Sequence, residues 1–429
     1  MSFSSCLVDI NALLDSAEPF SMVGVCIYKV PSAIRTLNEK AYTPTLVSIG
    51  PFHHDHPQLQ NMERHKLIYL KAFLQRTNAC LDTLVSNIKS NLSRFKSCYS
   101  ETLPFSDNEL VKLILIDSCF IIQLFWTYYY DDGFLFKPWL DDGIALDLLL
   151  LENQLPFFVI EEIYKLSSSS TNASVPKTTI PGFLELTIKY FYSSNKSNLF
   201  FDNGDISIMH FTDLIRIFHL QLPIEIRPSN NATDERMIHL PSATELLEAG
   251  VRFKVSTKSK CLLDLRFSKS GGVLEIPQLT VDDRTEILFR NMVALEQCHY
   301  PYESYITDYV AVLDYLINTG KDVDILVPNK ILENWLGDSD SVANLFTGLC
   351  KNVTHCNSSP HFTILCEDLK DFCRNPWPKF KYSLIGTLRR DYCSTPWKAG
   401  ASFAGILLLI LTIIQTVCSV FQVVQPNGS

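Results

Sequence analysis

The chain has 429 residues, of which 47 % are hydrophobic and 19 % are charged, and its formal net charge is −9. This composition allows a sizeable buried core and lacks the basic footprint of a nucleic-acid-binding protein, so no nucleic-acid partner is expected. Only 16 glycines occur, and neither GxGxxG nor GxxxxGK[ST] is present. The sequence therefore predicts no dinucleotide or phosphate-loop site and no cofactor.

The first segment, residues 1–26, has neither a positively charged start nor a continuous apolar run, so it does not resemble a signal peptide. We expect it to be a loosely ordered lead-in to a large domain over residues 27–396. Without a signal peptide, the 13 cysteines should remain reduced and behave as small hydrophobic residues. They form no tight CxxC pairs, which disfavours zinc binding.

Three histidines follow a proline-rich extended stretch: His53, His54 and His56. In a strand, His54 and His56 would share one face and could bind a metal ion if a third ligand came from elsewhere. No partner motif such as HExxH supplies that ligand. We therefore favour a packed, hydrogen-bonded loop against the next helix and predict no metal site.

Helical periodicity dominates the next part of the chain. The predicted helices cover residues 58–75, 108–126, 143–165, 181–193 and 208–220. A serine-rich run predicts a variable loop near residues 166–180. The apolar runs 113–125 and 148–160 contain acidic residues and are too short to span a membrane, so both are interpreted as buried helices.

Polar residues inside these two runs are the main site candidates. Buried polar side chains need hydrogen-bond partners, so Glu152, Asn153 and Gln154 are expected to form an internal network that fixes helix register. Asp117 is expected to pair with Arg290 or another cation. A ligand-binding or catalytic pocket near Asp117, Glu152 and His54 is the alternative.

The pattern changes after residue 241, where Ser242 or Thr244 could cap a short helix that Gly250 closes. Strands are predicted at 252–256, 261–267 and 273–276, and the last two should form a hairpin. Further helices are predicted over 282–298, 303–320, 332–336, 342–350 and 379–390. The expected fold class is mainly α (α+β): a large helical domain with one small antiparallel sheet near residues 251–280.

One pair of charged residues has helical spacing within the segment 282–298. Glu286 and Arg290 are four positions apart, which predicts an ion pair on one face of that helix.

The segment 399–424 contains no charged residue and fourteen Leu, Ile, Val or Phe residues. As a helix it would be about 39 Å long, against about 30 Å for the hydrocarbon core of a bilayer. It therefore predicts a single transmembrane helix, with a buried core helix as the alternative. Lys381, Arg389, Arg390 and Lys398 precede it, which predicts a tail-anchored protein with its large domain in the cytosol.

Small residues lie near the start of this predicted span at positions Gly400, Ala401, Ala404 and Gly405. Residues of this size four apart let two membrane helices pack closely, which would give a homo-oligomer. The alternative, that they only lie at the membrane interface, stays equally open.

Several motifs occur together in one order along the chain. They include Tyr28-Lys29-Val30-Pro31, Val47-Ser48-Ile49-Gly50-Pro51-Phe52-His53-His54, Asp117-Ser118-Cys119-Phe120, Leu151-Glu152-Asn153-Gln154-Leu155-Pro156, Pro241-Ser242-Ala243-Thr244 and Phe289-Arg290-Asn291. From Ile27 onward the chain resembles the plant family called domain of unknown function 247, or uncharacterised protein family 0481. Ser118 and Gln123 depart from it, because members usually carry glycine and often an acidic residue there. The resemblance implies a C-terminal membrane segment and no agreed enzymatic activity; some grass members are linked to self-incompatibility.

We predict a non-enzymatic, single-pass membrane protein of plants whose large domain mediates protein–protein recognition or signalling, in the plasma membrane or an endomembrane. Its expected partners are the lipid bilayer, through the C-terminal helix, and unidentified proteins. The alternative is a membrane-attached enzyme that uses the pocket near Asp117, Glu152 and His54. No local catalytic signature such as GxSxG supports an enzyme.

Overall fold

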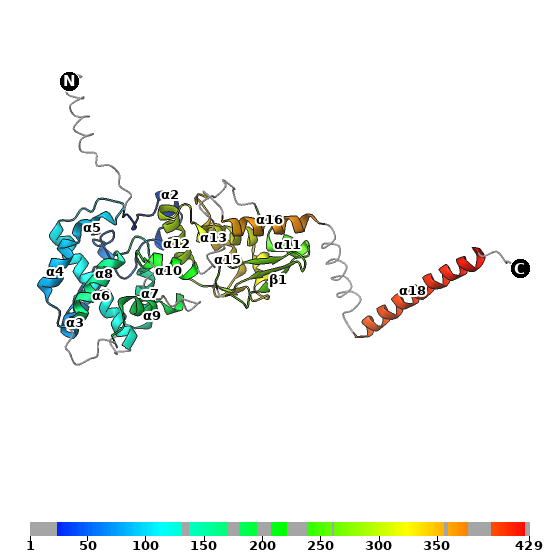
Figure 1. Cartoon of the computed structure of the whole chain (residues 1–429), viewed down its shortest axis with the longest axis horizontal. Coiled ribbons are helices and arrows are strands. Elements are labelled where there is room, and N and C mark those ends of the chain that lie inside the picture. Colours follow the sequence, from blue (N-terminus) through cyan, green and yellow to red (C-terminus); the bar gives the residue numbers. More distant parts are fainter. Residues whose placement is uncertain are drawn as a thin grey trace, which may run out of the picture.

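The computed structural model describes residues 24–130, 137–169, 180–194, 207–220, 239–259, 261–355, 359–375 and 396–424. Within these ranges helices predominate and the strands are short, so the prediction of a mainly helical fold is confirmed (Figure 1). Most of the predicted lead-in, most of the variable loop and the predicted helix 379–390 lie outside the described residues. Val25 and Cys26, which were assigned to the loosely ordered lead-in, are buried instead.

The N-terminal half is built around one long apolar helix, α6 (Asp107–Tyr130). It is packed against α3 (Gln60–Thr77), α4 (Leu81–Ser90), α8 (Phe157–Ser169) and α9 (Phe183–Tyr190). By length and composition α6 could cross a membrane, but 83 % of its apolar window is buried inside the protein. A helix that is apolar on all sides is stable in water only when neighbours cover it, so the predicted buried helix 113–125 is confirmed.

Shorter helices complete this half of the molecule. They are α2 (Ser32–Arg35), η1 (Glu39–Ala41), η2 (Pro57–Leu59), α5 (Leu92–Ser97), α7 (Pro138–Asp147) and η4 (Tyr192–Ser194). Several are single turns whose ends are joined by proline-containing connections, as expected where residues before proline avoid the helical region.

The predicted continuous helix 143–165 is wrong. The chain leaves the helical path after α7 and resumes it only at Phe157, and the connection between them is buried. Two features explain the break. Pro156 disfavours helical geometry at the preceding residue, and the Gln154 side-chain amide donates to the carbonyl oxygens of Leu148 and Leu150 (both 2.7 Å). Glu152, Asn153 and Gln154 therefore lie in an ordered loop and not in a helix.

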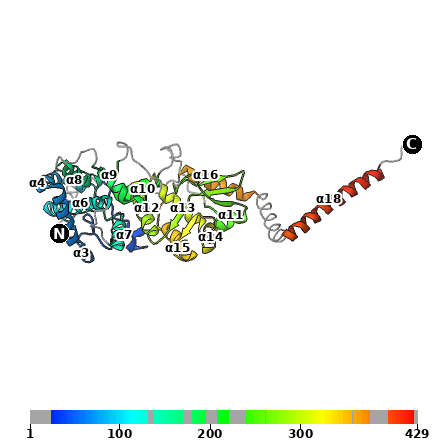
Figure 2. The same ribbon diagram turned by 90° about the horizontal axis from the view of Figure 1, so that it is seen from below.

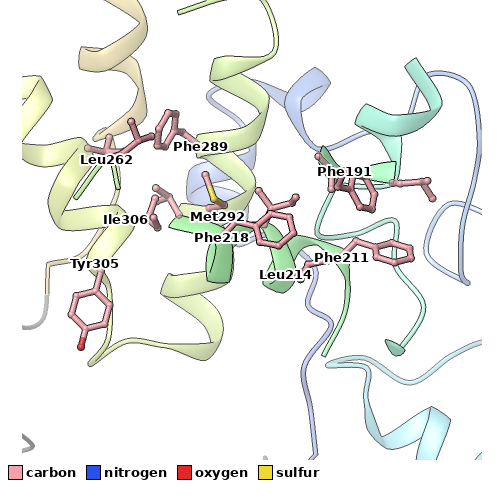
Figure 3. Packing of buried hydrophobic residues seen from close by; sticks show 14 of the residues in the cluster. Phe191, Phe211, Leu214, Phe218, Leu262, Phe289, Met292, Tyr305 and Ile306 are labelled. Atoms are coloured by element: carbon pink, nitrogen blue, oxygen red, sulfur yellow. The ribbon is translucent and has the colours of Figure 1, made fainter. Parts of the chain in front are cut away.

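The two halves meet where α10 (Phe211–His219) packs against α12 (Thr285–His299), which in turn packs against α13 (Tyr305–Leu316). Figure 3 shows Leu214 and Phe218 of α10 beside Met292 of α12, with Ile306 of α13 on the other side of Met292. All four side chains belong to one buried cluster that extends through both halves. The body is therefore continuous across this junction (Figures 1 and 2).

The C-terminal half adds α11 (Ala243–Glu248), α14 (Gly320–Leu326), α15 (Ser339–Leu349) and α16 (Pro360–Arg374). The predicted cap of α11 is confirmed, because the Ser242 hydroxyl accepts from the Glu245 amide and the Glu245 carboxylate accepts from the Ser242 amide. Gly250 follows with φ +95°, a left-handed conformation that glycine adopts easily.

The single antiparallel sheet is a prediction that the structure corrects. Strand β3 (Val273–Ile276) lies between β1 (Arg252–Val255), to which it is parallel, and β2 (Arg266–Ser268), to which it is antiparallel. The β2–β3 hairpin was predicted, although β2 is shorter than expected. The parallel pairing of β1 joins strands far apart in the chain, which local patterns do not specify.

A second sheet pairs β4 (Leu279–Val281) in parallel with β5 (Leu332–Asn334). The predicted helix 332–336 is therefore wrong. Hydrogen bonds at both ends of β5 extend the pairing: the Leu279 amide donates to the Ile331 carbonyl and the Trp335 amide to the Val281 carbonyl, both at 2.9 Å. An isolated five-residue helix is too short to be stable, so tertiary pairing decides the conformation.

The last described element is α18 (Pro396–Val424), whose described apolar part is Phe403–Ser419. Its described large side chains are exposed, and Figure 1 shows the helix apart from the body. Ala404 and Gly405 are exposed, and nothing lies within 4 Å of a Cβ built on Gly405. The side chains of Gly400 and Ala401 lie outside the described set.

One buried acid predicts how stability changes with pH. Asp308 of α13 accepts from the Ser359 amide at 2.6 Å, at the start of α16, and its Oδ1 has no hydrogen-bond partner. Burial, together with the nearby Glu296 carboxylate, raises the pKa of Asp308 to about 8, and the hydrogen bond from the Ser359 amide opposes that rise. Between the ordinary value of 3.8 and about 8, the folded state holds a proton that the unfolded state releases. The free energy of unfolding should therefore fall as pH rises through this window, by up to about 1.4 kcal/mol per pH unit.

The variant Asp308→Asn removes this titration but keeps an oxygen for the Ser359 amide. Its unfolding free energy should vary less with pH between 5 and 8 than that of the wild type, with the largest gain over the wild type at the alkaline end. Urea unfolding at a series of pH values measures this, and identical pH slopes would contradict it.

Candidate functional site

The extended segment Thr45–Gly50 is held by side chains that point at its backbone. Asp147, the last residue of α7, is buried, and its carboxylate accepts from three successive amides. The distances from these amide nitrogens are 3.0 Å for Thr45, 2.7 Å for Leu46 and 2.9 Å for Val47. Because this segment lies outside any helix or strand, its amides lack regular main-chain partners, and the Asp147 carboxylate supplies the acceptor for three of them.

Asn153 and Asp117 continue the same arrangement. The Asn153 Oδ1 accepts from the Ile49 amide at 2.7 Å, while its Nδ2 donates to the Val47 carbonyl at 3.0 Å. The Asp117 Oδ2 accepts from the Gly50 amide at 2.9 Å. We call Asp117, Asp147 and Asn153 the polar cradle. Together they hold five of the six residues of this segment by hydrogen bonds to main-chain groups.

A lysine from α3 completes the cradle. The Lys66 Nζ is fully buried and lies 2.7 Å from the Asp117 Oδ1 and 2.7 Å from the Glu63 Oε1, and it also donates to the Ser48 carbonyl. Burial raises the pKa of Asp117, although the contacts with Lys66 and the Gly50 amide oppose that rise. The cation beside Asp117 is therefore Lys66 and not Arg290. Lys66 lies on the buried face of α3 with Met62 and Tyr69, a polar interruption that the sequence does display.

Glu152 binds a different part of the chain. Its Oε1 accepts from the Val30 amide at 2.8 Å and lies 2.7 Å from the Arg35 Nη1, and its Oε2 lies 3.2 Å from the His53 Nε2. Burial raises the pKa of this carboxyl, but His53, the Val30 amide and Arg35 outweigh burial and hold it below its usual range. Glu152 thus joins the segment before α2 to the turn His53–His56, which we call the histidine turn.

Gln154 and Asn291 act in the same way on other segments. The Gln154 Oε1 accepts from the Phe211 amide at the start of α10 (2.9 Å). The Asn291 Oδ1 accepts from the Leu151 amide (2.9 Å), and its Nδ2 donates to the Ala41 carbonyl (2.8 Å). Asn291, Asp147 and Lys66 were not predicted as site residues. Each is a polar residue on a largely apolar helix face, and that is the one signal the sequence offers.

The histidine turn makes few polar contacts. The His56 amide donates to the His53 carbonyl at 3.1 Å, the His54 carbonyl accepts from the Gln60 side chain at 2.9 Å, and the His54 ring lies 6.0 Å from the ring of Phe105. Across the described part of the chain, no group of three or more His, Cys, Asp or Glu side chains is placed to hold a metal ion.

The predicted ion pair on α12 is present. The Arg290 Nε lies 2.7 Å from the Glu286 Oε1, which also accepts from the Asn38 side chain at 2.9 Å. The Arg290 Nη2 donates to the Gly348 carbonyl at 3.2 Å. This pair therefore connects α12 to the segment before η1 and to α15, and its contacts are separate from those of Asp117.

A second buried ion pair joins α10 to α12. The Arg216 Nε lies 2.9 Å from the Glu296 Oε1, and the guanidinium carbon lies 3.9 Å from the centre of the Tyr300 ring. Glu296 also accepts from the Thr307 amide at 2.8 Å. Burial raises the pKa of Glu296, while Arg216 and Thr307 lower it. This pair therefore links α10 to α12, the helices at which the two halves of the body meet.

Cavities of the described surface lie elsewhere. One of about 360 Å³ lies beside Tyr164 and Phe183, a second of about 360 Å³ beside Asp282 and Glu286, and one of about 270 Å³ beside Phe289 and Met292. Asp117, Glu152 and His54 line none of these three. The polar atoms of Asp117 and Glu152 bind backbone amides and cations, so the chemistry visible at these two residues is the positioning of the main chain.

The close approach at Gly50 gives a direct test of this packing. Gly50 has φ +73°, and a Cβ at this position would lie 2.3 Å from the Gln154 carbonyl oxygen. Gly50→Ala should lower the free energy of unfolding by about 3 kcal/mol or more, from left-handed strain plus overpacking. Gly182→Ala is the matched control, since nothing lies within 4 Å of its Cβ. Equal thermal stability of the two variants would contradict the packing described.

Comparison with known proteins gives a family and no solved structure. A family model described as DUF247, plant protein of unknown function, matches residues 27–411. The UPF0481 protein At3g47200 of Arabidopsis thaliana is 28 % identical over 96 % of this chain and 88 % of its own length. The putative UPF0481 protein At3g02645 of the same plant is 24 % identical over 93 % of this chain and 91 % of its own length. No solved structure matches. The match covers most of the chain and includes the cradle, and the chain therefore belongs to the DUF247 family of plant proteins of unknown function.

Proposed function

We propose that this protein is a non-enzymatic, single-pass membrane protein of plants whose large domain mediates protein–protein recognition or signalling. The observation that carries the membrane proposal is the contrast between α6 and α18. Both are long and apolar, but neighbouring helices cover α6, whereas the described side chains of α18 are exposed. Each Leu, Ile, Val or Phe near a bilayer centre contributes about −0.3 to −0.6 kcal/mol to insertion, so lipid is the favoured environment for α18.

The flanking charges support a cytosolic large domain. Lys381, Arg389, Arg390 and Lys398 precede the apolar helix, and positive residues next to a span favour the cytoplasmic side. Protease protection in intact membrane vesicles, with a tag at each end of the chain, tests this orientation. Digestion of the N-terminal tag with protection of the C-terminal tag is expected, and the reverse pattern would refute it.

Two features of the large domain support a role in recognition. Its buried polar groups hold main-chain segments in fixed positions, which suits a rigid binding surface. Large aromatic side chains are also exposed: Tyr302 is 73 %, Trp335 70 % and Trp139 65 % accessible. Tyrosine and tryptophan are enriched at protein interfaces, where they bury a large area at a low entropic cost.

Membrane fractionation tests the anchor. The full chain should remain in the membrane pellet after alkaline carbonate washing, and a chain without residues 399–429 should be released.

Leu408→Arg combined with Leu411→Arg should weaken insertion, because arginine at a helix centre costs about 2.5–3.5 kcal/mol in insertion experiments. Leu67→Arg with Ile68→Arg is the matched control, because these exposed apolar residues lie on α3. Release of the full chain without detergent would refute the anchor.

Crosslinking in plant membranes tests the recognition role. The wild type should crosslink to a specific protein, and Trp335→Ala or Tyr302→Ala should reduce that product without changing the amount of folded protein. A crosslinking pattern that matches that of an unrelated anchored protein would refute a specific partner.

A separate comparison tests self-association. Gly400→Leu with Gly405→Leu should reduce self-association if the small residues Gly400, Ala401, Ala404 and Gly405 pack two spans.

A further inference from the structure

Two cysteines from distant parts of the chain lie side by side. Ile27 and Tyr99 form an isolated parallel β-bridge, and Cys26 and Cys98 are the residues directly before them. The amides of Cys26 and Ile27 both donate to the Cys98 carbonyl at 2.9 Å, and the Ser100 amide donates to the Ile27 carbonyl at 2.9 Å. Two short backbone segments, one before α2 and one after α5, are therefore held in register.

This register suits a covalent bond between the two sulfurs. Neighbouring strands lie about 4.8 Å apart, and a disulfide needs Cα atoms about 4.4–6.8 Å apart. In a parallel pair, residues opposite each other point to the same side of the ladder. Both side chains are buried in the same cluster, at 6 % and 7 % exposure, and both cysteines are free thiols in this structure.

We propose that Cys26 and Cys98 form a modification site, at which a low-molecular-weight disulfide of the glutathione class converts the two thiols into an intramolecular disulfide. In the first step the Cys98 thiolate attacks one sulfur of glutathione disulfide, and one glutathione thiolate leaves. In the second step the Cys26 sulfur, after losing its proton to solvent, attacks the Cys98 sulfur and displaces the second glutathione. Two protein thiols are oxidised, and one glutathione disulfide is reduced to two glutathione molecules.

The surroundings assign the order of these steps. A hydrogen bond from the Cys26 thiol lowers the pKa of Cys98, burial opposes this, and the positive charge of Arg94 lowers it further. The same hydrogen bond, together with burial, raises the pKa of Cys26. Cys98 is therefore the thiol that loses its proton more readily, and Cys26 is the resolving thiol.

Two other described cysteines, Cys80 and Cys119, serve as controls. Cys80 is exposed, and hydrogen bonds from Thr83 lower its pKa, so it should react with glutathione disulfide but form a mixed disulfide only. Cys119 is buried in α6, and burial raises its pKa, so it should remain unreacted. Cys80→Ser removes the competing exposed thiol without touching the pair.

The disulfide would have a mechanical consequence for the fold. It would connect the segment that precedes α2 to the end of α5, closing a loop of about seventy residues. Such a link reduces the freedom of the unfolded chain, so the oxidised protein should melt a few degrees higher than the reduced protein. It would also fix the position of the Val30 amide, which donates to Glu152.

The experiment uses the full chain in lipid nanodiscs, wild type and Cys80→Ser, incubated natively over a range of glutathione redox ratios. Free thiols are then trapped by acid quenching and alkylation, and peptides are mapped by mass spectrometry without reduction. A Cys26–Cys98 linked peptide should appear as both thiols disappear together. In Cys26→Ser, Cys98 should accumulate as a glutathione adduct and no linked peptide should form.

Two results would overturn the proposal. One is the absence of the linked peptide at the most oxidising ratio, while Cys80 of the wild type is fully modified. The other is that linkages among other cysteines appear with equal yield. The wild-type map decides the question even if Cys26→Ser folds poorly, because that variant only assigns the order of the two steps.

Discussion

Replacing Lys66 by methionine should lower the free energy of unfolding by about 3–5 kcal/mol, because a buried carboxylate loses its cation. Methionine keeps the length and the apolar stem of lysine but removes the charge. Asp117 would then remain buried with the Gly50 amide as its principal donor, and the Ser48 carbonyl would lose its contact with Nζ. Thermal and urea unfolding of the full chain in detergent measure the loss.

Two comparisons separate the charge effect from general damage to α3. Lys71→Met changes an exposed lysine on the same helix and should leave stability within about 0.5 kcal/mol of the wild type. Lys66→Met combined with Asp117→Asn should recover much of the loss, because a neutral amide oxygen still accepts from the Gly50 amide. If Lys66→Met and Lys71→Met are equally stable, the buried pair does not contribute as described.

The sign of the pH effect provides a further readout. The pKa of Asp117 is already raised by burial, and removal of Lys66 takes away the contact that most opposes that rise. In the variant the folded state should therefore bind a proton more readily than the unfolded state. The stability deficit of Lys66→Met should shrink as pH falls, as linkage requires when the folded pKa lies above the unfolded value.

Replacing Asp147 by alanine should lower the free energy of unfolding by about 3 kcal/mol, since the amides of Thr45, Leu46 and Val47 lose their common acceptor. Val47 is buried and cannot turn to water, whereas Thr45 is exposed and can, so the loss should be smaller than three full desolvation penalties. Hydrogen exchange at these three amides should accelerate more than exchange in α6.

Matched variants sharpen this test as well. Asp147→Asn keeps an acceptor oxygen and should lose less stability than Asp147→Ala. Asp142→Ala removes an exposed acid from the same helix and should have little effect. Unchanged exchange at residues 45–47 in Asp147→Ala would show that the carboxylate does not hold this segment.

Local patterns were sufficient for the features that depend on nearby residues. The continuous apolar stretch of α6, the capping residues of α11, the Glu286–Arg290 spacing and the β2–β3 hairpin each involve partners within a few positions of one another. Helices α4 and α16 were not predicted. In α4 the apolar residues Leu81, Leu84, Val85 and Ile88 do have helical spacing, so this helix could have been predicted from the sequence.

The polar residues inside the apolar runs could be recognised from the sequence, but most of their partners could not. Asp117, Glu152, Asn153 and Gln154 stand out because they interrupt apolar runs, and the structure places all four in buried contacts. Their partners are mostly main-chain amides. Every residue carries such an amide, so no side-chain pattern indicates which one will be bound.

From the sequence alone it follows that most of the body is helical, that certain polar residues must be buried with partners, and that residues 399–424 form an uncharged, largely apolar stretch. The tertiary structure alone decided that Lys66 pairs with Asp117, that Asn291 binds the Leu151 amide, that β1 and β4 find parallel partners, and that residues 148–156 leave the helical path. Lys66 and Asp117 are 51 positions apart along the chain, and Leu151 and Asn291 are 140 positions apart. Helical and strand periodicities report only which face of an element is apolar, so the register between distant segments depends on how the assembled body satisfies its buried polar groups.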